Sequence, residues 1–245
     1  MKLNRTVLLA ITLTTLSLIS AQPAPAATPA ATPSIYTMSN HVSQSISMGD
    51  NSVLLMASNK LKVECPEGKA LASFALKRSG NNFHYNFKCI HNRAIKTGAN
   101  SLISRANAFS AMGSGKSTVF LDRQNVACPG EYGIKSFVLN SSGRTLSYSY
   151  VCVKIATRSC IAKESKSESN GGNEELAYLD RQSVAAETNQ FLNQFQLHTR
   201  GANYVYGYKT CTILDPPTPA PVIAVEPELR ITNTDNQRDL KRRFR

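Results

Sequence analysis

A glycine-rich segment, Gly113-Ser114-Gly115-Lys116-Ser117-Thr118, is the part of the chain that most resembles a known chemical motif. It matches the end of a phosphate-binding loop, in which backbone amides and a lysine hold phosphate groups. The full motif needs a glycine five residues before Gly115, where this chain has Ser110. It must also lead into a helix, whereas Val119-Phe120-Leu121 is expected to lead into a β-strand. We therefore interpret the segment as a basic loop and predict no nucleotide cofactor.

Patterns that indicate catalysis or metal binding are weak. The chain has no Gly-x-Ser-x-Gly nucleophile elbow, and its four histidines are scattered, with no triad context. Glu174, Glu175 and Asp180 are close in sequence, but paired catalytic carboxylates need a spatial arrangement that spacing alone does not define. No Cys-x-x-Cys motif occurs, which argues against a metal site. We predict no catalytic residue, no metal and no cofactor, and keep an enzyme only as an alternative.

Paired charged residues recur at Asp122-Arg123 and Asp180-Arg181, and the corresponding position nearer the N-terminus has Asn59-Lys60. As binding residues, the three pairs would line equivalent pockets and hydrogen-bond a sugar or a headgroup. As structural residues, they would form an ion pair in a turn or edge strand that helps to set register. We favour the structural interpretation and retain these six residues as candidate binding residues.

The elements that would position these pairs belong to an internal repeat of three copies, which must be found before any fold is predicted. The middle copy contains Leu121 to Cys128, Ser136 to Leu139, and Tyr148 to Cys152. The same pattern appears without a gap 58 residues later and 63 residues earlier. Three ungapped windows make chance agreement improbable, so the repeat is the strongest signal in the chain.

Each copy is predicted to consist of β-strands. Phe137 and Leu139 alternate with small or polar neighbours, as do Tyr148, Tyr150 and Cys152. The Ser-Ser-Gly-Arg sequence between the two runs is typical of a hairpin turn, and a third strand around Val126 should precede the hairpin. The four tyrosines of the last two copies are expected to form buried stripes; they are Tyr148, Tyr150, Tyr206 and Tyr208.

One copy alone would expose an apolar face, and three copies around an axis bury these faces together. The sequence therefore predicts an all-β, pseudo-threefold, three-repeat domain that is β-prism-like. A β-trefoil is the first alternative and an open sandwich the second. The segments between the copies, 91 to 118 and 154 to 177, could each add a strand or remain loops.

The six cysteines allow 15 pairings, but the repeat restricts them. Cys65 and Cys89 occupy the same positions as Cys128 and Cys152, and both positions change together in the third copy, to Ala186 and Thr210. We therefore predict bonds Cys65–Cys89 and Cys128–Cys152, and we pair the remaining Cys160 with Cys211. Such bonds require an oxidising compartment.

The ends of the chain differ from its middle. Residues 1–21 combine a positive start with an apolar run and predict a cleaved signal peptide. Residues 22–34 are rich in Pro, Ala and Thr and predict a linker. The β domain is expected at 35–214, with repeat cores at 58–90, 121–153 and 179–212.

The predicted tail, 215–245, is first proline-rich and then basic. Its last 16 residues hold six basic and two acidic side chains, out of a net charge of +12 for the whole chain. This assigns much of the positive charge to the tail, which would either bind an anionic surface or remain solvated without a specific partner. No nucleic acid is expected as a partner. Asn140 begins an Asn-Ser-Ser sequence and is the predicted glycosylation site, in an exposed hairpin turn.

The repeat resembles a cysteine-paired repeat of secreted eukaryotic proteins. It also looks distantly like the three-repeat β-prism domain that ends apicomplexan perforin-like proteins, where a Cys-Pro and a downstream Phe-x-Leu recur. Cys65-Pro66 with Phe74 to Leu76, and Cys128-Pro129 with Phe137 to Leu139, carry this likeness over about 150 residues. The resemblance implies binding to a surface or a lipid headgroup, and it transfers no site residue.

Together these features predict a secreted, extracellular, disulfide-stabilised binding module. Its partner would be a glycan, a lipid headgroup or a protein. A secreted hydrolase or toxin-like effector and a structural coat or matrix protein are the alternatives. Three equivalent shallow pockets at the Asp-Arg pairs would favour binding, a deep pocket with histidines and carboxylates would favour an enzyme, and a featureless surface would favour the structural role.

Overall fold

The computed structural model describes residues 36–47, 49, 52–112, 117–172 and 175–214. The predicted signal peptide, linker and C-terminal tail lie outside the described residues, as do the first four residues of the glycine-rich segment at 113–116.

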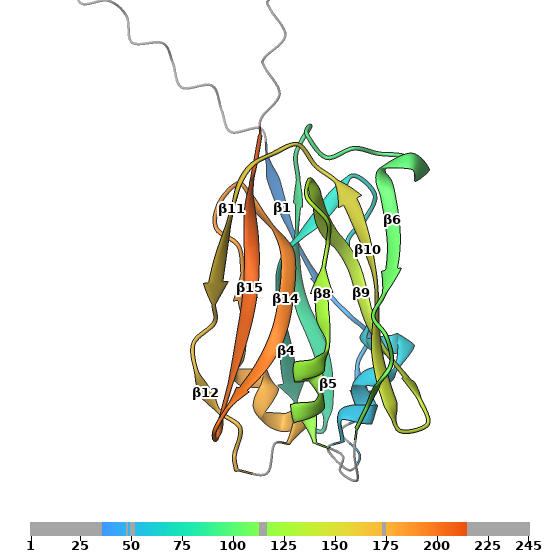
Figure 1. Ribbon diagram of the computed structural model, residues 1–245, viewed down its shortest axis with the longest axis vertical. Coiled ribbons are helices and arrows are strands. Elements are labelled where there is room, and N and C mark those ends of the chain that lie inside the picture. The colour runs from blue at the N-terminus through green and yellow to red at the C-terminus, as the bar shows by residue number, and fades with distance from the viewer. Residues whose placement is uncertain (1–35, 48, 50–51, 113–116, 173–174, 215–245) are drawn as a thin grey trace, which may run out of the picture. The chain divides into compact units, whose positions relative to one another are not determined.

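The described chain is nearly all β and forms three five-stranded antiparallel sheets (Figure 1). Sheet 1 contains β1 (Thr37–Val42), β2 (Ile46–Ser47), β4 (Lys69–Ser79), β5 (Asn82–His91) and β13 (Val184–Ala185). Sheet 2 contains β3 (Val63–Glu64), β6 (Leu102–Ala106), β7 (Ser110–Ala111), β9 (Tyr132–Ser142) and β10 (Thr145–Lys154). Sheet 3 contains β8 (Asn125–Ala127), β11 (Thr157–Glu164), β12 (Glu168–Ser169), β14 (Gln190–Arg200) and β15 (Asn203–Ile213).

Each sheet is built on one long hairpin, as the alternation of apolar residues predicted. The hairpins are β4–β5, β9–β10 and β14–β15, and each has one register shift. Their two-residue turns begin with Gly80, Gly143 and Gly201, whose φ angles are 57°, 57° and 58°. Glycine is needed here because a tight hairpin turn requires a positive φ at its first central residue.

The segments between the copies also add strands. β6 and β7 pair with β10, and β11 and β12 pair with β15. β1 and β2 do the same for β5 in the first copy. Each long hairpin is therefore widened on one side by a strand from the preceding connection.

Short 3-10 helices lie just before the first strand of each copy. They are η1 (Val53–Ala57), η2 (Asn59–Leu61), η4 (Thr118–Arg123) and η5 (Leu176–Arg181), with a further one, η3 (Ala99–Ser101), in the connection before β6. Val119 to Leu121 lie in η4, so the expectation that they lead directly into a strand was wrong. A serine begins this helix, because the Ser117 hydroxyl accepts a hydrogen bond from the Val119 amide at 3.1 Å.

The strand that precedes each hairpin pairs with the hairpin of another copy. β3 pairs with β9, β8 pairs with β14, and β13 pairs with β4. The first copy thus gives a strand to sheet 2, the second to sheet 3, and the third back to sheet 1. This cyclic exchange joins each sheet to the next and closes the pseudo-threefold, β-prism-like domain. An open sandwich would not have the last of these three connections.

The shared core lies where the three sheets face one another. Equivalent phenylalanines Phe74, Phe137 and Phe195 meet there, with ring centroids 4.7 to 5.1 Å apart. Each ring is at most 3% exposed, and edge-to-face packing of this kind adds to the free energy of burial.

A second aromatic layer follows the first. Tyr85, Tyr148 and Tyr206 are also equivalent, and each packs its ring against two of the three phenylalanines. Their side chains are buried, and burial is the main reason why the pKa of each phenol is raised above its ordinary value. The expectation of buried tyrosine stripes thus holds for Tyr148 and Tyr206. Tyr150 is buried as well, and Tyr208 is half-buried.

The three disulfides are Cys65–Cys89, Cys128–Cys152 and Cys160–Cys211, the pairing that the repeat indicated. Cys65 follows β3 in sheet 2 and Cys89 lies in β5 of sheet 1, so this bond joins two sheets. The second bond joins sheets 3 and 2 in the same way. Cys160 and Cys211 instead face each other on neighbouring strands of sheet 3.

The third copy lacks the inter-sheet bond, and the double variant Ala186→Cys/Thr210→Cys is expected to restore it. Ala186 follows β13 as Cys65 follows β3, and its amide donates to Ala72 as that of Cys65 does to Lys135. Thr210 is 1% exposed and its hydroxyl has no partner, so its replacement loses no hydrogen bond. Loop closure should raise the free energy of unfolding by up to about 3 kcal/mol. Mass mapping of the new bond and denaturant unfolding check this, with each single cysteine variant as control; a bonded variant without added stability would contradict it.

Candidate functional site

Each sheet has a shallow depression on its outer face, away from the shared core. We call them depressions 1, 2 and 3 after their sheets, and their volumes are about 370, 560 and 340 Å³. These volumes are those of small-ligand sites rather than of surface roughness. Because successive side chains of a strand point to opposite faces, the residues between the core aromatics point into the depressions.

The three depressions occupy equivalent positions of the repeat. Their linings share five positions. Two of them hold larger side chains: Phe87, Tyr150 and Tyr208; and Lys88, Val151 and Lys209. The other three form the floors: Ser73, Ser136 and Gln194; Ala75, Val138 and Gln196; and Asn86, Ser149 and Gly207. Most of these side chains are short, which is why the face is hollow in the middle of each hairpin. The repeat that builds the core therefore also builds three hollows outside it.

The floors offer hydrogen-bonding groups and positive charge. Hydroxyl and amide side chains line all three, and lysines stand at the margins, Lys88 in depression 1, Lys62 in depression 2 and Lys209 in depression 3. Such groups can donate and accept hydrogen bonds with a polyol and attract an anion. Apolar and aromatic side chains lie beside these polar groups, among them Phe87 in depression 1 and Tyr150 in depression 2. The floors therefore combine hydrogen-bonding groups with apolar surface on which the face of a sugar ring could pack.

Depression 3 also contains a histidine and a carboxylate, His198 and Glu164. Both carboxylate oxygens of Glu164 accept hydrogen bonds from Arg200, which is the main cause of the lowered pKa of this carboxyl. A carboxylate held in this way is a poor proton acceptor. Glu164 is therefore held as an ionised partner of Arg200 at the edge of this depression.

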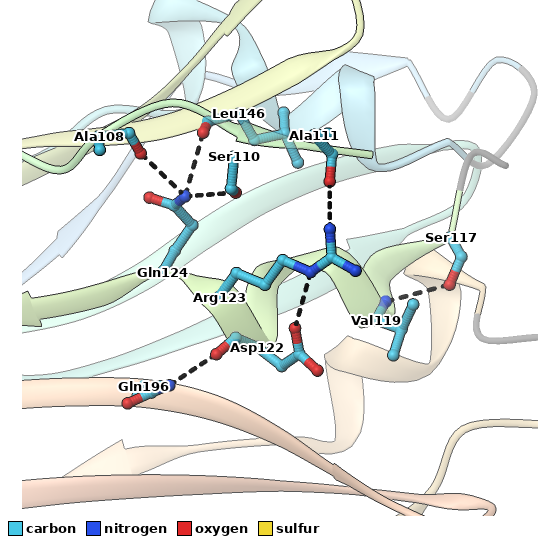
Figure 2. A network of polar contacts seen from close by, with 10 residues as sticks. All are labelled: Ala108, Ser110, Ala111, Ser117, Val119, Asp122, Arg123, Gln124, Leu146 and Gln196. Atoms are coloured by element: carbon cyan, nitrogen blue, oxygen red, sulfur yellow. Dashed lines mark hydrogen bonds and ion pairs between the residues drawn. The ribbon is translucent and has the colours of Figure 1, made fainter. Parts of the chain in front are cut away.

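The Asp-Arg pairs stand at the ends of 3-10 helices and not in turns or edge strands. Arg123 Nη1 donates to the Ala111 carbonyl at 2.7 Å, and Arg123 Nε lies 3.9 Å from Asp122 Oδ1 (Figure 2). The Asp122 carbonyl accepts from Gln196 Nε2 at 2.6 Å. In the third copy the Asp180 carbonyl accepts from Lys77 Nζ at 3.0 Å. These contacts join each helix to its own connection or to the next sheet.

The six predicted binding residues are not equivalent in the structure. The guanidinium groups of Arg123 and Arg181 pack over the neighbouring rings of Phe120 and Tyr178, at 5.0 and 4.6 Å. Asn59 and Lys60, in contrast, line a hollow of about 360 Å³ between β1 and β3. The three pairs do not line the three depressions, so the binding interpretation of these pairs finds support only in the first copy.

Sequence reasoning missed the residue that follows each pair. Gln124 is 1% exposed, and its Nε2 donates to Ser110 Oγ, to the Leu146 carbonyl and to the Ala108 carbonyl (Figure 2). Its Oε1 accepts from the Tyr148 amide at 3.3 Å and from Asn107. Gln182 donates to the Lys166 and Tyr204 carbonyls in the same way. The available signal was a polar residue repeated at an otherwise apolar position, since the first copy has Leu61 there.

Two further expectations need correction. Asn140 lies within β9 and is half-buried, and its Nδ2 donates to Ser149 Oγ at 2.8 Å, so it is not in the hairpin turn. The positive charge is also not mainly in the tail. The described residues alone hold 19 basic and nine acidic side chains, so the β domain itself is strongly basic.

Within the described part of the chain, no three His, Cys, Asp or Glu side chains are grouped so that they could hold a metal ion. None of the helices described is long and apolar enough to cross a membrane. Comparisons with protein-family models, with curated proteins and with solved structures find no match to this chain.

Proposed function

We propose that the protein is a secreted binding module that recognises an extracellular glycan through the three depressions. The observation that carries the proposal is their repetition: the same five positions of the repeat line a hollow on all three sheets. Three sites on one chain raise the avidity for a repetitive ligand far above the affinity of each site. Polymeric glycans present such a ligand.

The chemistry of the floors supports a glycan over the other partners considered. Serine hydroxyls and asparagine and glutamine amides hydrogen-bond sugar hydroxyls, and shallow open floors admit a sugar chain from outside. The three disulfides support export to an oxidising compartment, where such glycans occur.

The test is a binding screen of the full chain, secreted from a eukaryotic host, against a glycan array. Lipid vesicles and cell-surface proteins form separate arms. We expect binding to glycans, and loss of most of it in the triple variant Asn86→Ile/Ser149→Ile/Gln194→Ile, which removes one polar group and adds a branched side chain in each depression. Isoleucine is compatible with a strand, so the fold should remain.

A matched control is His84→Ile, also on the outer face of β5 but outside the lining of depression 1. It should bind as the unchanged protein does. Binding to lipid vesicles or proteins without any glycan would overturn the proposal. So would glycan binding that the triple variant retains in full while its circular dichroism remains native.

A further inference from the structure

The three sheets meet at three edges, and one of these edges differs from the other two in the polar side-chain contacts across its outer part. We call an edge a seam, where β1, β6 or β11 of one sheet lies beside the exchanged strand of the next. Seam 1 lies between β1 and β3, seam 2 between β6 and β8, and seam 3 between β11 and β13. Seam 3 lacks the inter-sheet disulfide of the other two and is instead joined by an ion pair, whereas seam 1 keeps its disulfide and differs in the groups along its outer part.

Side chains bridge seams 2 and 3. At seam 2 the Tyr150 hydroxyl, from sheet 2, donates to the carbonyl of Ala127 in sheet 3 at 3.2 Å. At seam 3 Lys163, from sheet 3, forms an ion pair of 2.5 Å with Glu187, which follows β13 of sheet 1. Both contacts run from one sheet to the next across the outer part of the seam.

Seam 1 lacks the group that makes the contact at seam 2. Its residue at the position of Tyr150 is Phe87, which has no hydroxyl to donate, and the Phe87 ring stacks instead on His41 of the same sheet at 5.3 Å. The hollow of about 360 Å³ noted above opens here. Its lining includes His41, Asn59, Lys60 and Glu64.

The charge at seam 1 differs as well. Asn59 stands where the other copies have Asp122 and Asp180, so one carboxylate is absent. Glu64 is already neutralised, because Lys62 Nζ lies 2.6 Å and Lys135 Nζ 3.7 Å from its carboxylate. The first of these contacts is the main cause of its lowered pKa. The charge of Lys60 remains in excess, and the hollow is positive.

The hollow at seam 1 is continuous with two of the depressions. It shares His41, Val42 and Phe87 with depression 1, and it shares Lys62 and Glu64 with depression 2. A path of hollow surface therefore runs from the outer face of sheet 1 across seam 1 to the outer face of sheet 2. This path crosses the strands, with hydrogen-bonding groups at both ends, such as Asn86 and Ser149, and excess positive charge in the middle.

We propose that depression 1, the hollow at seam 1 and depression 2 form one elongated groove that binds an extended acidic glycan chain. This inference rests on the proposed function and adds the shape and the charge of the ligand. The chain lies across the strands, its hydroxyls bind the two floors, and an anionic group of a central sugar lies against Lys60. Depression 3 remains a separate, shorter site.

The experiment measures the binding of the full chain to size-fractionated fragments of hyaluronan, which carries carboxylates, of heparin, which also carries sulfates, and of uncharged dextran. We expect affinity for at least one acidic series to rise with length, from disaccharide upward, until a fragment spans the groove, and then to level off. Dextran of equal length should bind at least about tenfold more weakly, because a charge-assisted contact is lost. A comparison of hyaluronan with heparin shows whether a carboxylate is enough for binding or whether a sulfate is needed.

Two variants restore at seam 1 what the other copies have. Asn59→Asp adds the missing carboxylate and should weaken acidic fragments by about five- to tenfold, with little effect on dextran. Phe87→Tyr adds the hydroxyl that faces the carbonyl of Glu64, as Tyr150 faces Ala127, and should shorten the length at which affinity levels off. The control is Asp122→Asn, the same change in the second copy at a residue that lines neither depression 1, depression 2 nor the hollow at seam 1. It should leave both the affinity and the length at which affinity levels off unchanged.

The outcomes separate this inference from the proposed function. Glycan binding that is lost in the triple variant, but is independent of length and of Asn59→Asp, overturns the groove and leaves the depressions as sites. Equal affinity for dextran and both acidic series also overturns it. Failure of the full chain to bind any glycan overturns both.

Discussion

Replacing Phe137 with alanine is expected to lower the free energy of unfolding by about 3–5 kcal/mol, the usual cost of removing a large aromatic side chain from a core. Phe137 is 1% exposed and lies on the axis where all three sheets meet. Its ring contacts Phe74, Phe195, Tyr85 and Tyr148, so two other copies of the repeat lose a partner at once. Urea unfolding followed by circular dichroism measures the change.

A matched control for this variant is Phe109→Ala. Phe109 is 54% exposed, and its loss should change the free energy of unfolding by less than about 0.5 kcal/mol. The Phe137→Ala transition should remain a single cooperative step, because the three sheets share one core. Two separate transitions, with one sheet unfolding before the others, would contradict a core that is closed by strand exchange.

The second large effect is expected for Gln124→Leu, which gives the second copy the residue that the first copy has at Leu61. The amide of Gln124 pairs with the buried carbonyl of Leu146 and the buried amide of Tyr148, among other groups. Leucine leaves these groups without a partner, and each buried unpaired group costs about 1–3 kcal/mol. We expect a net loss of about 3 kcal/mol, measured by urea unfolding.

Gln182→Leu is the parallel variant in the third copy, and its loss should be comparable, since Gln182 holds the equivalent Tyr204 carbonyl at 2.9 Å. The reverse variant, Leu61→Gln, should also lower the free energy of unfolding, because Leu61 is buried and an amide at its position has no hydrogen-bond partners arranged to receive it. Unchanged stability in Gln124→Leu would mean that the buried amide network does not hold η4 to sheet 2.

Much of this fold could be predicted because the same pattern of apolar, turn and cysteine positions occurs in three copies of the repeat. The alternation around Phe137 and Tyr148 placed the hairpins, and the glycines between them placed the turns. The joint change of two cysteines to Ala186 and Thr210 indicated which cysteines pair. All these signals are local or are repeated at a constant spacing, which is why one sequence was enough.

The exchange of strands could not be predicted in the same way. The pattern around Val126 predicts a strand, but pairing with β14 or with β9 buries the same valine equally well. The choice depends on how η4 turns the chain, and η4 was hidden because Val119 to Leu121 suit a strand as well as a short helix. Propensity is a weak guide for segments of this length.

The candidate site was predicted only in part. Charged pairs drew attention to Asp122 and Asp180, but their carbonyls and not their carboxylates make the contacts between sheets. The depressions were not expected because their floors are short, unremarkable side chains such as Ser73 and Ala75, which become a hollow only on a curved sheet. The difference at seam 1 is recognised only when the three copies are compared. In the sequence its sign is Asn59, which stands where the other copies have aspartate.

The most direct test of the account is the avidity of the full chain for a surface coated with the glycan that the array selects, with one, two and then three depressions filled. Asn86→Ile, Ser149→Ile and Gln194→Ile are combined for this purpose. We expect the avidity to fall stepwise, by at least about tenfold between one and three filled depressions, because each substitution removes one of several linked sites. Avidity equal to that of the unchanged protein in the folded triple variant would contradict it.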